Sequence, residues 1–127
     1  MYINLEPNDD HAIEAYSEHE VRINAIIYSH NLIVSQAELI TDWDIKSIAQ
    51  FNKDTLAPLL TLQPEIILIA HTQSNLFAPS AAIQHLAKHN ISLECMSIGS
   101  ACRTFNVLLS EKRNVVLGII LKKAVES

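Results

Sequence analysis

The sequence is poor in glycine, proline and cysteine, and each shortage excludes a class of structure. Two Gly and four Pro among 127 residues leave little room for long loops or for a glycine-rich phosphate-binding loop. Six residues separate Cys95 from Cys102, a spacing that fits neither a CxxC redox motif nor a zinc-binding pair. We therefore expect two free thiols in a reducing cytoplasm, with no cofactor and no metal.

Positive charge and long apolar runs are also scarce. The formal net charge is −5, so the chain has no overall positive field that would hold nucleic acid or an anionic membrane surface. The longest apolar run, 115–121, is far shorter than the ~20 residues that a membrane-spanning helix needs. Residues 1–10 lack a basic region followed by an apolar run, so we expect no signal peptide. These features predict a cytoplasmic protein with no transmembrane segment and no nucleic-acid partner.

The residues that are present predict an α/β fold. A hydrophobic content of 49% with 18% charged residues indicates a folded core, and the length suits one domain, which we place at 1–127. Continuous apolar runs and alternating segments predict strands at 65–70, 91–96 and 115–121. Apolar residues at helical spacing predict helices at 52–62, at 79–89 and from about Ser100 onward. Alternating helices and strands imply a sheet with helices packed on it and some neighbouring strands parallel.

The N-terminal third is predicted to be rich in β-structure. An alternation of apolar and polar side chains indicates one strand over 20–28. Residues 29–31 are typical of a turn, so we expect 32–34 to return as the second strand of a hairpin. Two further short strands are expected at 39–40 and 45–48.

The passage from the strand into the third helix, within 94–109, is the strongest candidate for a binding site. The first N–H groups of a helix have no partner inside it and favour negative charge. Gly99 permits a close approach, and Arg103 adds a cation of forked shape. Open α/β sheets tend to hold ligands at the carboxyl ends of strands, and His71 follows the strand at 65–70. The alternative is an ordinary capped helix with Arg103 in solvent.

Two further features of this helix have both a functional and a structural interpretation. Arg103, Asn106 and Ser110 recur at i, i+3 and i+7, as they would on a recognition stripe or simply on the solvent face of an amphipathic helix. Cys102 lies in the first turn, where the helix end would stabilise a thiolate. It also falls at the margin of the apolar stripe, which favours a buried and unreactive thiol. The sequence contains no complete catalytic constellation, so we predict no catalytic residue.

The run 96–108, MSIGSACRTFNVL, resembles the C-terminal signature of a known family, roughly M-x-T-G-A-A-x-R-T-Y-N-x-L. The family continues with E-G-R and a final strand, to which 111–113 and 115–121 are similar. Upstream, the segments 62–68 and 77–79 resemble its P-E-I-L-L and F-P-P segments. The family is the domain of unknown function of Mth-type and Xcc-type prokaryotic proteins, which also includes a mitochondrial complex I assembly factor. The match covers most of the chain.

This resemblance implies a three-layer α/β domain with a central mixed β-sheet, the Mth-type fold, and no established enzyme activity. By analogy it implies a role in assembling a membrane respiratory complex or associated machinery. Two positions depart from the family pattern: His71-Thr72-Gln73 replaces the usual Gly-Thr-Gly, and Phe105 replaces the motif's Tyr. The predicted binding residues are Gly99, Ser100, Arg103, Thr104, Asn106 and His71.

We therefore predict a non-enzymatic binding or assembly-helper protein. Its partner would be a protein, and a membrane-associated partner is one option. Arg103 would be the main anchor of the contact. One alternative is a protein or enzyme that binds a small anionic metabolite at the helix start, through Gly99, Arg103 and His71. The other is a redox or nucleophilic thiol protein acting through Cys102.

Overall fold

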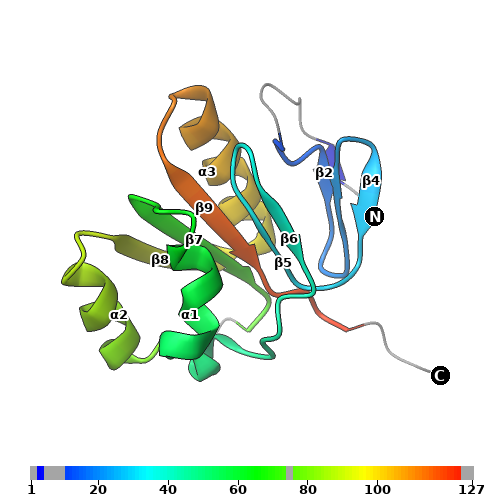
Figure 1. The fold of residues 1–127 in the computed structure, drawn as a ribbon. Helices are drawn as coiled ribbons and strands as arrows, with labels where there is room; N and C mark the ends of the chain where they lie inside the picture. Colours follow the sequence, from blue (N-terminus) through cyan, green and yellow to red (C-terminus); the bar gives the residue numbers. More distant parts are fainter. Residues whose placement is uncertain (1–2, 5–10, 74–75, 124–127) are drawn as a thin grey trace.

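The computed structural model describes residues 3–4, 11–73 and 76–123, which form two β-sheets and three α-helices (Figure 1). The first sheet, here the N-terminal sheet, contains β1 (Ile3–Asn4), β2 (Ala15–Tyr16), β3 (Val21–Ile23) and β4 (Ile26–Tyr28), in that order. The second, here the central sheet, contains β5 (Leu32–Val34), β6 (Leu39–Thr41), β7 (Ile66–His71), β8 (Ser92–Ser97) and β9 (Val115–Ile119). The helices are α1 (Lys53–Leu60), α2 (Ser80–Ala87) and α3 (Ile98–Ser110), with a 3-10 helix η1 (Ile48–Gln50) before α1.

The central sheet is mixed, with the strand order β6-β5-β9-β7-β8. Strand β7 runs parallel to both β8 and β9, whereas β5 runs antiparallel to β9 and β6. Helices α1 and α2 cover one face, and α3 and the N-terminal sheet share the other (Figure 1). The apolar run of β7 serves both faces, since Ile67 and Ile69 belong to one core and Leu68 and Ala70 to the other. The predicted three-layer α/β fold with a central mixed sheet is confirmed.

Trp43 anchors the corner between β6 and η1. Its side chain is buried, and its Nε1–H donates to the backbone oxygen of Thr55 at 3.1 Å. A Cβ on Gly118 would lie 2.7 Å from the indole, so the glycine in the middle of β9 makes room for this ring. The strand predicted at 45–48 is wrong. The Ser47 side chain accepts a hydrogen bond from the Ala49 N–H and starts η1 there.

Helix α3 begins earlier than the sequence indicated. Ser97 is its N-cap residue, and the Ser97 hydroxyl accepts a hydrogen bond from the Ser100 N–H at 3.3 Å. Gly99 and Ser100 therefore lie in the first turn of the helix rather than in a turn that precedes it. The predicted helices at 52–62 and 79–89 are confirmed as α1 and α2, each with shorter bounds.

The single strand predicted over 20–28 is wrong, because a tight turn divides it. Asn24 and Ala25 both have positive φ, 52° and 65°, as a two-residue type I′ hairpin turn requires, and Val21 pairs with Tyr28. The predicted hairpin partner 32–34 is also wrong. It forms β5, which pairs with β6 and β9 in the central sheet.

Candidate functional site

A cavity of about 700 Å³ opens at the carboxyl ends of β7 and β8. His71 and Ser97 pair at the ends of these parallel strands. From there the chain continues into α2 on one face of the sheet and into α3 on the other. Strands whose connections diverge in this way leave a crevice that commonly holds ligands. We call this space the carboxyl-edge cavity; it is lined by residues 16–19, 71–72, 76–77 and 95–99.

His71 is a buried histidine at this cavity, with 7% of its surface exposed. Burial removes water from the imidazole and lowers its pKa below the ordinary value of 6.5. The Gln73 N–H donates to His71 Nδ1 at 3.1 Å. A neutral ring whose Nδ1 accepts must carry its proton on Nε2. His71 therefore presents a neutral N–H donor near neutral pH.

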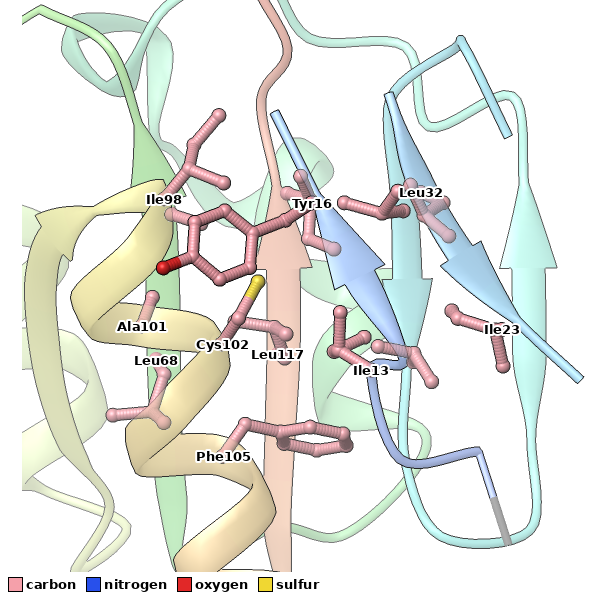
Figure 2. Packing of buried hydrophobic residues seen from close by; sticks show 14 of the residues in the cluster. Ile13, Tyr16, Ile23, Leu32, Leu68, Ile98, Ala101, Cys102, Phe105 and Leu117 are labelled. Atoms are coloured by element: carbon pink, nitrogen blue, oxygen red, sulfur yellow. The ribbon is translucent and has the colours of Figure 1, made fainter. Parts of the chain in front are cut away.

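Gly99 lies at the cavity, and the close approach that it permits is taken by Tyr16. A Cβ on Gly99 would lie 2.9 Å from the Tyr16 hydroxyl oxygen and 3.0 Å from Arg103 Nη1. Figure 2 shows the Tyr16 ring pointing from β2 toward the start of α3, close to Ile98. A residue of the same chain thus fills the space beside Gly99, so this glycine has a packing role whether or not a ligand binds.

Arg103 contacts the N-terminal sheet, and Asn106 contacts the segment just before its strand β2. Arg103 Nη1 donates to the Tyr16 hydroxyl at 2.6 Å. Asn106 pairs with the backbone of Ile13: its Oδ1 accepts from the Ile13 N–H at 2.9 Å, and its Nδ2 donates to the Ile13 oxygen at 3.0 Å. These polar side chains of α3 hold the N-terminal sheet beside it. Ser110, the third member of the predicted stripe, bonds only to Val107 within the helix, at 2.7 Å, among the described residues.

The six predicted binding residues therefore occupy three places. Gly99 and His71 meet at the carboxyl-edge cavity. Arg103 contacts Tyr16 in the N-terminal sheet, and Asn106 contacts Ile13, which lies just before strand β2 of that sheet. Ser100 accepts a hydrogen bond from the Ser97 hydroxyl at 3.1 Å, and Thr104 is half-buried on α3. Their role in binding stays a prediction.

Sequence reasoning did not find the wall of the cavity that comes from the N-terminal sheet. Tyr16 contacts Arg103 across 87 positions of the chain, and no local pattern reports such a contact. Phe77 also lines the cavity and is 80% exposed. The sequence drew attention to Phe77 only through the resemblance of 77–79 to a family segment. No sequence pattern indicated that its side chain would be exposed.

The two thiols are poor nucleophiles. Cys102 is fully buried, as its position at the apolar stripe indicated. Burial raises its pKa to about 12, and the nearby Arg103 charge opposes this only in part. Cys95 lines the cavity, and partial burial raises its pKa as well. Both residues are therefore protonated near neutral pH, which leaves little thiolate for redox or nucleophilic chemistry.

The described lining of the cavity carries little charge. Among its described lining residues, Glu18 is the one Asp, Glu, Lys or Arg side chain. Its carboxylate lies 3.8 Å from Lys122 Nζ, and both side chains are exposed. Within the ranges that the structure describes, no cluster of three or more His, Cys, Asp or Glu could hold a metal ion. None of the helices in these ranges combines the length and apolarity needed to span a bilayer.

Known proteins are similar to this chain over most of its length. A family model described as "Protein of unknown function (DUF498/DUF598)" matches residues 13–120. The "13 kDa major membrane protein" of Francisella tularensis subsp. holarctica (strain LVS) is 37% identical over 94 residues, 73% of this chain and 76% of that protein. The NADH dehydrogenase (ubiquinone) 1 alpha subcomplex assembly factor 3 of Drosophila melanogaster is 28% identical over 112 residues, which cover 85% of this chain but 57% of the fly protein.

Solved structures share the fold. The NMR structure of XCC1710 from Xanthomonas campestris has a TM-score of 0.84 and 28% identity, and the match covers 100% of this chain and 97% of that one. The solution NMR structure of a Bordetella pertussis protein, described as a Mth938-like domain, has a TM-score of 0.77 with 17% identity, over 97% of this chain and 94% of that one. At this identity the second likeness concerns the fold alone.

Proposed function

The chain belongs to the DUF498/DUF598 family of proteins of unknown function, and we propose that it is a non-enzymatic binding protein that helps to assemble a membrane respiratory complex or associated machinery. The family resemblance predicted from the motif around Arg103 is confirmed. The assembly role is our extension from the distant similarity to the fly assembly factor. We propose that it acts in the cytoplasm, in keeping with the free thiols of Cys95 and Cys102.

The observation that carries this proposal is the carboxyl-edge cavity with an exposed apolar rim. The cavity lies at the point where the connections from β7 and β8 diverge. Leu76 and Phe77 stand at its edge with 38% and 80% of their surfaces exposed. Exposed aromatic side chains beside a hollow are typical anchors of protein interfaces. A segment of a protein partner that enters the cavity would cover both side chains.

The predicted site residues take different parts in this proposal. Gly99 and His71 would contact the partner from the cavity, because both line it. Arg103 would act mainly by holding Tyr16, which forms the opposite wall. Asn106 would hold the same wall through Ile13. The exposed part of Arg103, together with Ser100 and Thr104, would extend the contact surface along α3.

The two alternatives lack a supporting observation of this kind. For an anionic metabolite at the helix start, the described cavity lining supplies no Lys or Arg side chain, and Arg103 donates to Tyr16. A thiol mechanism would need an accessible thiolate, and burial keeps Cys102 protonated.

A deletion strain tests the assembly role. We expect cells that lack the gene to accumulate less of a fully assembled respiratory complex in their membranes, measured by native gel electrophoresis and NADH oxidation. Wild-type protein should restore the complex, and Phe77→Asp should not, because a charge at the rim would oppose an apolar contact. Ile83→Asp is the matched control, since Ile83 is also exposed, at 46%, but lies on α2 outside the cavity lining.

Two results would contradict the proposal. One is a normal level of every respiratory complex in the deletion strain. The other is equal rescue by Phe77→Asp and Ile83→Asp, because it would show that the rim of the cavity has no special part in assembly.

A further inference from the structure

Two histidines line the carboxyl-edge cavity, and their backbone contacts fix opposite hydrogen-bonding roles for them. His71 accepts at Nδ1 from the Gln73 N–H, so its neutral ring carries a proton on Nε2 and donates there. His19 Nδ1 lies 2.8 Å from the backbone oxygen of Lys122. A carbonyl oxygen only accepts, so His19 donates from Nδ1 and its neutral ring accepts at Nε2. The cavity therefore has one donor and one acceptor nitrogen.

The donor nitrogen of His71 belongs to a side chain that lines the cavity. Among the described residues, no hydrogen bond satisfies His71 Nε2, whereas Nδ1 has its partner in Gln73. No fully buried side-chain nitrogen or oxygen in the described residues lacks a partner. In the described part of the chain, the Nε2–H group is therefore a donor without an assigned acceptor, at the cavity that His71 lines.

The ring of His19 is held in place by the chain that follows β9. Besides its own bond to the Lys122 oxygen, the Lys122 N–H donates to the backbone oxygen of Glu18 at 2.8 Å. This pairing ties the segment after β2 to the chain that leaves β9. His19 is otherwise exposed, so its Nε2 is available to a bound molecule.

We infer that the cavity binds an uncharged peptide group that carries an apolar side chain, with the peptide C=O accepting from His71 Nε2–H and the peptide N–H donating to His19 Nε2. An amide supplies one acceptor and one donor, which is the complement of this pair. The apolar side chain would lie against Leu76, Phe77 and Met96, which line the same space. This inference rests on the proposed function, and it names the chemistry of the partner segment.

A carboxylate is a poor substitute for the amide in this cavity. It offers acceptors only, so it would place a lone pair against His19 Nε2. It would also lose water beside the carboxylate of Glu18, and the neighbouring Arg103 already donates to Tyr16. Selectivity for the neutral amide is therefore the property that identifies the site.

A pair of probes with nearly the same shape tests this selectivity on the purified protein. 3-Phenylpropanamide is neutral, and 3-phenylpropanoate, which contains no amide group, carries a carboxylate at pH 7.5. We expect the amide to shift the backbone NMR signals of Thr72 and Gly99, and to bind about tenfold more tightly than the acid, the ratio that one satisfied hydrogen bond of ordinary strength supplies. Equal or tighter binding of the acid would overturn the inference, as would the absence of shifts at these signals with either probe.

Variants of exposed histidines show whether the acceptor nitrogen is responsible. His19→Phe should bring the amide-to-acid affinity ratio close to one, because it removes the Nε2 acceptor and keeps an aromatic ring. His89→Phe is the matched control, since His89 is exposed and outside the cavity lining, and it should keep the wild-type ratio. An unchanged ratio in His19→Phe would contradict the assigned role. These measurements need no partner and no cells, so amide binding with normal respiratory assembly would reject the proposed function alone.

Discussion

The central sheet and the N-terminal sheet are held in the molecule by different means. Strands β7 and β9 lie between two cores, and nearly every side chain in them is buried. The N-terminal sheet contributes to one core only, and its last strand, β4, leaves Ile26 and Ile27 about half exposed, at 55% and 51%. The N-terminal sheet therefore packs from one side only, on a core that α3 and the central sheet share with it.

This difference matters because the carboxyl-edge cavity lies between the two regions. One wall is the end of the central sheet, and the other, residues 16–19, continues from β2. Three contacts from α3 place that second wall: the packing of Phe105 in the core that contains Ile13 (Figure 2), the Asn106–Ile13 pair and the Arg103–Tyr16 bond. Removing them one at a time shows how far the two regions are independent.

The largest effect is expected from Phe105→Ala, which should destabilise both sheets at once. Phe105 is fully buried in the core shared by α3, the central sheet and the N-terminal sheet, so its loss should lower the free energy of unfolding by about 3–5 kcal/mol. Urea denaturation followed by Trp43 fluorescence measures this. Val107→Ala on the exposed side of α3 is the control, expected within about 0.5 kcal/mol of wild type. A loss below about 1 kcal/mol for Phe105→Ala would mean that the shared core contributes little.

A smaller and more local effect is expected from Asn106→Ala. The change leaves the Ile13 N–H and C=O without their side-chain partner, at a cost of about 1–3 kcal/mol. Amide hydrogen exchange should accelerate at 21–28 in the N-terminal sheet and stay unchanged at 66–71 in β7. Ser110→Ala is the control, because its hydroxyl bonds only within α3 among the described residues. Equal acceleration in both sheets would show that they open as one unit.

The same two regions differ in how well the sequence predicts them. The strands at 65–70 and 115–121 were correct because a continuous apolar run of that length is typical of a strand buried on both faces. The prediction of one strand over 20–28 failed because the turn within it, Asn24-Ala25, contains no glycine and does not interrupt the apolar alternation. Strand β5 was recognised, but its pairing with β9 was not, since β9 lies over 80 positions away along the chain.

The candidate site shows the same limit. Periodicity correctly put Arg103 on the exposed side of α3, and chain order correctly brought His71 to the edge that holds Gly99. The sequence could not predict the contact between Arg103 and Tyr16, because the two residues are far apart in the chain. The opposite tautomers of the two histidines depend on backbone atoms that only the folded structure brings together.

The Arg103–Tyr16 bond should contribute less than either earlier contact. Arg103 is exposed, and an exposed hydrogen bond competes with water, so we expect a coupling of about 0.5–1 kcal/mol. A double-mutant cycle of Arg103→Ala and Tyr16→Phe measures it from urea denaturation. Zero coupling would mean that the guanidinium does not fix the Tyr16 ring, and that the packing beside Gly99 places the wall without it.

The smallest effect should come from the pH response of His71, and it sharpens the comparison from the side of the central sheet. Burial holds the pKa of His71 in the folded protein below the ordinary value of 6.5 that applies when the chain unfolds. As the pH falls through the window between these values, His71 takes up a proton in the unfolded chain but stays neutral in the folded protein. The free energy of unfolding contributed by neutral His71 is therefore complete above pH 6.5 and is lost as the pH falls through the folded pKa.

His71→Gln should flatten this dependence, because glutamine does not titrate and keeps an acceptor for the Gln73 N–H. Urea denaturation from pH 7.5 down to pH 5 measures the slope, with His89→Gln as the control outside the cavity. An unchanged slope in His71→Gln would show that other groups cause the acid sensitivity. If the slope flattens, and amide exchange at low pH accelerates first at 66–71 rather than at 21–28, the protonation of His71 acts on the wall that the central sheet supplies. The two walls of the cavity then respond to different perturbations, the one to acid and the other to the loss of contacts from α3.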